Sequence, residues 1–96
     1  MNCCYIIYSE TLRRHYIGAS HDDLQTRIDK HNSHEYGEHR YTSKASDWKL
    51  VISITCDSYS QARKIEDHIK NMKSTVYISN LLKYPEMIDK LKDKYM

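Results

Sequence analysis

The chain has 96 residues, of which 40% are apolar and 29% charged, and its formal net charge at pH 7 is only +2. This is ordinary globular composition, and it excludes a disordered or collagen-like chain. No apolar run approaches the roughly 20 residues that a membrane-spanning helix requires. The length leaves little room for a second hydrophobic core, so we expect a single domain over residues 1–96.

The N-terminal residues lack the basic and then apolar pattern of an export signal, so we expect a cytoplasmic protein. The three cysteines include the neighbours Cys3 and Cys4 and cannot form a fully paired disulfide framework, which predicts reduced, buried strand residues. A zinc site would have to use histidines such as His31, His34 and His39. Neither a matched cysteine pair nor a helical His-x-x-x-His accompanies them, so we do not expect structural zinc.

The first part of the chain has the pattern of a β-hairpin followed by a helix. Aromatic and β-branched residues at 3–8, a polar stretch at 9–14 and a second apolar run at 15–18 predict the two strands. Residues 20–23 resemble a capping box, and Leu24 and Ile28 follow one helical turn apart, which predicts a helix over about 22–32. The polar segment 33–47 has no periodicity and predicts a surface loop.

The second part of the chain begins with residues 48–56, in which apolar and other side chains alternate. This alternation predicts a strand with one apolar face, made of Trp48, Leu50, Ile52, Ile54 and Cys56. A capping box at 58–61 then opens a helix to about residue 73, with apolar positions at Ala62, Ile65, Ile69 and Met72.

Two shorter helices complete the chain. We expect one over 75–83, packed through Val76, Ile78 and Leu82, and one opening at Pro85 that carries Met87, Ile88 and Leu91. The order ββαβα plus C-terminal helices predicts an α/β (α+β) fold with a small three-stranded antiparallel sheet flanked by helices.

Two tyrosines in the hairpin carry a family resemblance. Tyr16-Ile17-Gly18 is an intact YIG motif, Cys3-Cys4-Tyr5 stands where a GIY motif would be, and the two tyrosines are eleven positions apart. In this the chain resembles the GIY-YIG nuclease superfamily, and within it the single-domain bacterial type. The resemblance extends from Cys3 to Leu82 through these residues: Ala19, Ser20, Leu24, Arg27, His31, Asn32, Tyr41-Thr42-Ser43-Lys44, Trp48-Lys49-Leu50-Val51 and Ala62-Arg63-Lys64-Ile65-Glu66.

The resemblance implies the GIY-YIG fold and gives roles to several residues. Tyr5 would serve as general base or orient the attacking water, with help from Tyr16. Because tyrosine ordinarily titrates near pH 10, a base role requires a positive charge or a metal nearby. Arg27 and His31 are four apart on one helix face, so both can reach one phosphate, Arg27 as its clamp and His31 as a proton relay.

The same resemblance makes Glu66 the ligand of a divalent metal, Mg²⁺ or Mn²⁺. One carboxylate suffices for such an ion when substrate phosphate and water complete its shell. Contacts to nucleic acid are expected from Arg27, Lys44, Arg63 and Asn80. From the residues alone, simpler interpretations stay open: cross-strand packing for the tyrosines, a solvated helix flank for Arg27 and His31, and an exposed helix acid near Lys70 for Glu66.

The resemblance thus implies a metal-dependent endonuclease that hydrolyses a DNA phosphodiester by activated-water attack, in DNA repair or recombination. The chain has no glycine-rich phosphate loop and no nucleophile elbow, so other chemistries are less well supported. The replacement of the first Gly and Ile by Cys3 and Cys4 keeps open a catalytically weak nucleic-acid-binding module. A nuclease subunit whose protein partner supplies specificity is a further alternative, because a small domain offers little surface for reading DNA.

Overall fold

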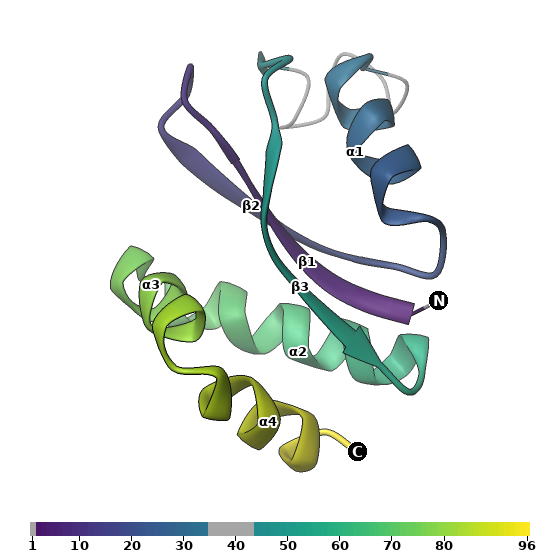
Figure 1. The fold of residues 1–96 in the computed structure, drawn as a ribbon, viewed down its shortest axis with the longest axis vertical. Helices are drawn as coiled ribbons and strands as arrows, with labels where there is room; N and C mark the ends of the chain where they lie inside the picture. Colours follow the sequence, from purple (N-terminus) through teal and green to yellow (C-terminus); the bar gives the residue numbers. More distant parts are fainter. Residues whose placement is uncertain (1, 35–43) are drawn as a thin grey trace.

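The computed structural model describes residues 2–34 and 44–96. Its three strands are β1 (Asn2–Ser9), β2 (Arg14–Ser20) and β3 (Lys49–Cys56), and its four helices are α1 (Leu24–Asn32), α2 (Tyr59–Met72), α3 (Thr75–Lys83) and α4 (Pro85–Lys94). The sheet has the order β2-β1-β3 with both pairings antiparallel, so β1 is the central strand (Figure 1). The predicted α+β class and three-stranded antiparallel sheet are therefore confirmed.

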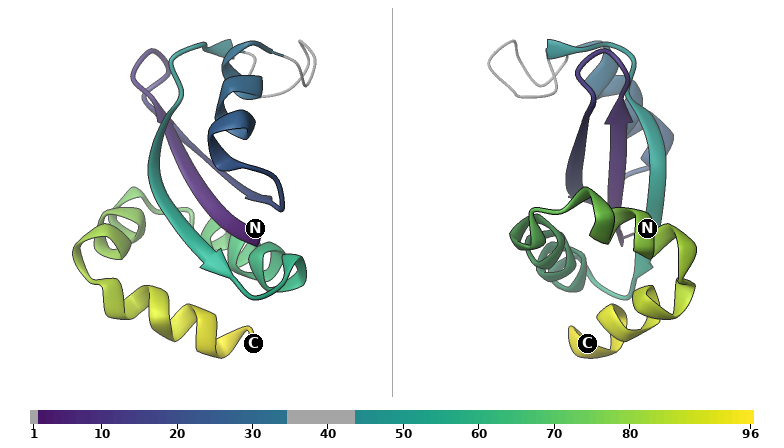
Figure 2. Two further views of the ribbon diagram at one scale, coloured as in Figure 1. Left: turned by 45° about the vertical axis from the view of Figure 1, so that its right-hand side comes forward. Right: turned by 90° about the vertical axis from the view of Figure 1, so that its left-hand side faces the viewer.

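The sheet separates two hydrophobic cores of unequal size. Of the four helices in the described part of the chain, α1 lies against one face, whereas α2, with α3 and α4 beyond it, covers the other (Figures 1 and 2). Side chains alternate along β1, so Cys3, Tyr5 and Ile7 belong to the core beneath α1, whereas Cys4 and Ile6 belong to the core beneath α2. No helix in residues 2–34 and 44–96 combines the length and apolarity needed to span a bilayer.

The three cysteines are free and buried on strands, as the sequence predicted. Burial raises the pKa of the Cys3, Cys4 and Cys56 thiols, most strongly for Cys4 on the central strand. A thiol kept protonated is a poor nucleophile and a poor metal ligand. The cysteines therefore act as small apolar packing residues.

The turn of the β1–β2 hairpin is fixed by a carboxylate from a distant part of the chain. The Ser9 hydroxyl donates to Asp47 at 2.6 Å, and both the backbone N–H and the hydroxyl of Thr11 donate to it at 3.0 Å. These hydrogen bonds, that of Ser9 above all, hold the pKa of the Asp47 carboxyl below its usual range. The residue Arg13 completes the turn in the left-handed conformation, with φ of 52°.

A β-bulge in β3 overturns part of the predicted strand face. Ile6 pairs with Ile52 but Ile7 pairs with Leu50, so Val51 is an extra residue in the ladder. Val51 packs into the α2-side core, while Trp48 joins the α1-side core and Leu50 is 47% exposed. The placement of Trp48 and Leu50 on the face of Ile52 was wrong, because alternation with a period of two assumes an unbroken ladder.

Helix α2 begins and packs largely as predicted. The Ser58 hydroxyl accepts the backbone N–H of Gln61 at 3.1 Å, which is half of a capping box. The Gln61 side chain does not return to Ser58; it accepts from the N–H of Asp57 and donates to the carbonyl of Lys92, tying α2 to α4. Ala62, Ile65 and Ile69 are buried as expected, but Met72 is 45% exposed.

The predicted packing of α3 was wrong at two of three positions. Ile78 is buried, but Val76 and Leu82 are 67% and 54% exposed, and the buried partner of Ile78 is Leu81. Apolar residues occur on both sides of this helix, so the sequence pattern did not identify which side packs. Helix α4 begins at Pro85 and buries Leu91, with Met87 and Ile88 packed against the same core.

Candidate active site

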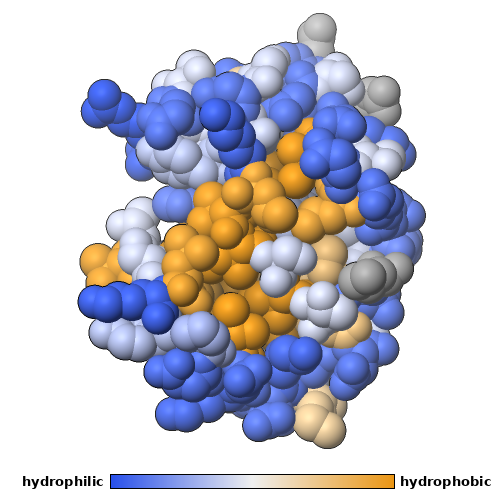
Figure 3. Space-filling model, viewed as in Figure 1, coloured by the Kyte–Doolittle hydropathy of each residue, from blue (hydrophilic) through white to orange (hydrophobic). Residues whose placement is uncertain are grey.

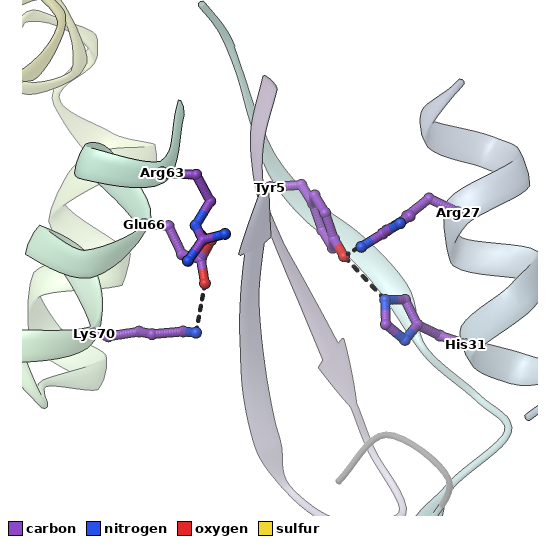
Figure 4. A network of polar contacts seen from close by, with 6 residues as sticks. All are labelled: Tyr5, Arg27, His31, Arg63, Glu66 and Lys70. Atoms are coloured by element: carbon purple, nitrogen blue, oxygen red, sulfur yellow. Dashed lines mark hydrogen bonds and ion pairs between the residues drawn. The ribbon is translucent and has the colours of Figure 1, made fainter. Parts of the chain in front are cut away.

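The site is built around Tyr5 in the middle of the central strand. Its side chain is fully buried and points toward α1 (Figure 4). Tyr5 pairs with Gly18 of β2, and a Cβ atom on Gly18 would lie 2.6 Å from both Cζ and the hydroxyl oxygen of Tyr5. The tyrosine ring therefore occupies the space that any larger residue at position 18 would need. Gly18 of the YIG motif therefore leaves the space that the ring of Tyr5, from the other motif, occupies.

Helix α1 brings a cation and an imidazole to the Tyr5 hydroxyl. The helix is capped by Asp23, whose carboxylate accepts from the N–H and hydroxyl of Thr26 at 3.0 Å, so it begins slightly later than predicted. One turn separates Arg27 from His31, and both reach Tyr5. The Tyr5 oxygen lies 2.9 Å from Nε2 of His31 and accepts the Nε–H of Arg27 at the longer distance of 3.4 Å.

The hydrogen-bonding capacities of these groups suit proton transfer between Tyr5 and His31. An arginine nitrogen can only donate, so the Tyr5 oxygen is the acceptor in its bond with Arg27. The same oxygen can donate its O–H to Nε2 of a His31 ring that carries its proton on Nδ1, or accept from the Nε2–H of the other tautomer. The His31 side chain is buried, with 4% of its surface exposed.

Tyr16 connects the two sides of the site. Its ring centroid lies 5.1 Å from that of His31 and 6.4 Å from that of Tyr5, on the α1 side of the sheet. The ammonium of Lys70, from α2 on the opposite face, lies 6.0 Å from the same ring. Because β2 is an edge strand, side chains from both layers can meet around its margin.

Glu66 belongs to the α2 side of the site. It is 8% exposed and its carboxylate lies 2.5 Å from the Lys70 ammonium and 3.6 Å from Nε of Arg63. Figure 4 shows these three side chains across the strands from Tyr5, Arg27 and His31. A carboxylate this buried requires compensating positive charge, which the two cations provide. The simpler interpretation of Glu66 as an exposed helix acid is thus wrong, although its pairing with Lys70 is present.

The structure therefore divides the expected site residues into two groups. Tyr5, Arg27 and His31 share hydrogen bonds, whereas Glu66 is joined to Arg63 by an ion pair. Lys70 was expected as a neighbour of Glu66 and as one of the clustered basic residues able to meet phosphates. Its spacing of four residues after an acid was the sequence signal for the pairing that the structure shows.

The remaining expected contacts lie farther out. Lys44 is exposed at the edge of the segment 35–43, and that segment, which includes His39 and Tyr41-Thr42-Ser43, lies outside the described residues. Asn80 is on α3, and its backbone carbonyl accepts from the N–H of Tyr84 at 2.8 Å. The roles expected for Lys44 and Asn80 stay predictions.

One supporting residue was not expected from the sequence. The Asn32 side chain at the end of α1 accepts the backbone N–H of Trp48 at 2.7 Å and donates to its carbonyl at 3.1 Å. This pair of bonds attaches the end of α1 to the chain that enters β3. Its partner is sixteen residues away across the loop, so sequence spacing alone gives no signal for it.

One of three comparisons with known proteins finds a match. A family model described as the GIY-YIG catalytic domain matches residues 1–79 of the 96-residue chain. The match spans the three strands, α1 and α2, so it includes both tyrosines, Arg27, His31 and Glu66, and it ends one residue before Asn80. No curated protein and no solved structure matches the chain.

Proposed function

The chain belongs to the GIY-YIG family, whose catalytic domain is a nuclease, and we propose that this protein is an endonuclease cutting DNA by metal-dependent attack of water on a phosphodiester. The observation that carries the proposal is the Tyr5 hydroxyl held between Arg27 and His31. A tyrosine that only packed would need one partner for its buried hydroxyl, whereas Tyr5 has both a cation and an imidazole at its oxygen.

The proposed proton path runs through three side chains. His31 Nε2 takes the Tyr5 proton, and the positive charge of Arg27 favours the resulting anionic oxygen. That oxygen takes a proton from water as the water oxygen forms its bond to phosphorus and the bond to the leaving oxygen breaks. The leaving oxygen is protonated by His31, which restores the neutral histidine, or it is protonated from solvent while His31 returns its own proton to solvent.

Arg27 would change partners during this reaction. Tyr5 is fully buried, and Arg27, which is only partly buried, donates to its hydroxyl. When a phosphate arrives, the guanidinium can turn to it and offset the charge that develops on its oxygens. This movement also gives water access to the tyrosine oxygen.

Nucleases of this family generally depend on a divalent metal, and Glu66 fits such an ion. Its carboxylate is a hard oxygen donor and is partly enclosed, and a divalent ion bound there would take the place of Lys70 and Arg63, which now pair with it. Among the described residues, no three His, Cys, Asp or Glu side chains cluster as a metal site, so Glu66 would share the ion with substrate phosphate and water. Bound Mg²⁺ or Mn²⁺ would supply Lewis-acid stabilisation of the leaving oxygen.

DNA repair or recombination is the cellular setting that we propose, with a protein partner that supplies substrate specificity. The domain is small relative to the surface that sequence-specific DNA recognition buries. One alternative has support in the structure: a DNA-binding module without turnover would explain why Tyr5 is fully buried and Glu66 is paired with Lys70.

Glu66→Gln tests the proposal against this alternative. It removes the carboxylate charge but keeps the size, so we expect loss of Mg²⁺-dependent cleavage with DNA binding retained or slightly stronger. Glu86→Gln is the matched control, because Glu86 is an exposed acid in the first turn of α4. Both variants and the wild type are assayed for cleavage on a panel of labelled DNA structures and for gel-shift binding with and without Mg²⁺. If the wild type binds but never cuts, and Glu66→Gln changes nothing, the binding module replaces the nuclease.

A further inference from the structure

A basic cavity lies beside the proposed active site. It has a volume of about 310 Å³ and is enclosed by the end of the β1–β2 hairpin, the last turn of α2 and the start of α3. The space-filling view shows the outline of the molecule indented between the hairpin and α3 (Figure 3). The walls carry Arg13, Arg14, Lys70 and Lys73, and the floor includes Ile69 and Ile78.

The charge of this cavity is of one sign. Its lining contains two arginines and two lysines but no aspartate or glutamate. The first residues of α3 also line it, and the positive end of a helix dipole adds to the field of the side chains. Lys70 is paired with Glu66, but Arg13, Arg14 and Lys73 bring three further positive charges to a partly apolar hollow, and a bound anion would offset their mutual repulsion. The lining therefore has the chemistry of a phosphate site.

Two of the cations occupy backbone positions that glycine would fit better. Arg13 in the hairpin turn has φ of 52°, and Lys73 at the C-cap of α2 has φ of 49°. The left-handed conformation is unfavourable for residues with a Cβ atom, and glycine is the usual residue at such caps and turns. The chain thus keeps a cation at both positions at some expense to the backbone.

The cavity is continuous with the proposed active site through Lys70. This lysine lines the cavity, pairs with Glu66 and lies near the Tyr16 ring. Glu66 and Lys73 are seven residues apart on α2, which corresponds to about 10 Å along a helix.

We propose that this cavity binds a backbone phosphate of the DNA strand, distinct from the phosphate of the scissile bond. The inference rests on the proposed function, because it concerns the same DNA substrate. Arg13, Arg14 and Lys73 contact the DNA strand at a second phosphate, away from the one that reacts. Lys70 lies between these cations and Glu66. The cavity thus extends the site beyond the residues that perform the chemistry.

The left-handed backbone at Arg13 and Lys73 allows the loss of a charge to be separated from a loss of stability. Lys73→Gly and Arg13→Gly each remove one charge while relieving a left-handed residue, so we expect their melting temperatures to equal or exceed that of the wild type. Lys90→Gln removes one charge from an exposed position on α4 and is the matched control. DNA affinity is measured in EDTA by fluorescence anisotropy over a range of salt concentrations.

For each glycine variant we expect DNA affinity to fall several-fold and the slope of log affinity against log salt to decrease in magnitude by about 1. The control should keep the wild-type slope. If the glycine variants fold well and keep the wild-type DNA affinity and salt dependence, the proposed phosphate site in the cavity is wrong. The proposed function is not affected by that result. A wild type that neither binds nor cuts DNA would instead refute the proposed function. If inorganic phosphate raises the wild-type melting temperature while the slopes do not change, the cavity serves a small anion and the inference is wrong.

Discussion

Gly18→Ala should damage both the fold and the site, because of the close approach of Tyr5. The added Cβ would lie 2.6 Å from two atoms at the tip of the tyrosine ring, about 1 Å closer than the roughly 3.5–4.0 Å of ordinary contact. The backbone at Gly18 does not require a positive φ, so the conflict is with the side chain alone. Overpacking of this kind costs about 1–3 kcal/mol.

The expected consequences can be measured separately. A loss of about 1–3 kcal/mol should lower the melting temperature by roughly 4–8 °C per kcal/mol in a domain of this size. Cleavage should fall by at least ~100-fold even below the melting temperature, because a shift of about 1 Å in the Tyr5 hydroxyl misplaces it relative to the water. Thermal denaturation and single-turnover cleavage report the two effects.

A double-mutant cycle isolates the cause. In a Tyr5→Leu background the ring tip is absent, so adding Gly18→Ala should cost less than ~0.5 kcal/mol. In a Tyr5→Phe background Cζ remains, and the cost should stay near the wild-type value. If Gly18→Ala lowers the free energy of unfolding equally in the wild type, in Tyr5→Leu and in Tyr5→Phe, contact with the Tyr5 ring is not the cause.

Three further predictions concern the site and the hairpin. Arg27→Ala should fold normally and cleave at least ~100-fold more slowly in single-turnover assays, and a well-folded mutant with near-wild-type cleavage would exclude the phosphate role. Tyr5→Phe should lose about 1 kcal/mol in urea unfolding and at least ~100-fold in cleavage, and normal cleavage would make Tyr5 structural. The lowered pKa of Asp47 implies that its contribution is present above its unfolded pKa and is lost as pH falls through the folded value. Urea unfolding from pH 6 to pH 2 should therefore be less pH-dependent in Asp47→Asn, and an unchanged profile would contradict this.

Local patterns predicted the elements well, and their failures have a physical cause. The hairpin, α2 and α4 were found because alternation, a serine cap and Pro85 act within a few residues. The positions of Trp48 and Leu50 were missed because the bulge at Val51 depends on pairing with β1, which the strand's own sequence does not encode.

The site was predicted in part for the same reason. Helical spacing placed Arg27 and His31 on one face, and the motif spacing identified Tyr5 as their partner. The separation of Glu66 onto the opposite layer depends on how α2 crosses the sheet, and that is a property of tertiary packing. The bond of Asn32 to Trp48 likewise crosses a long loop.

The isolated position of α1 has a consequence for how the protein opens. This helix has nine residues, too few to be stable alone, and no other helix of residues 2–34 and 44–96 shares its face of the sheet (Figure 2). Its buried residues are Ile28 and His31, so its amide hydrogens should exchange with solvent through a local opening that leaves β1 and α2 protected. The Tyr5–His31 bond exists only while α1 is closed, so activity should decline on warming before the sheet unfolds.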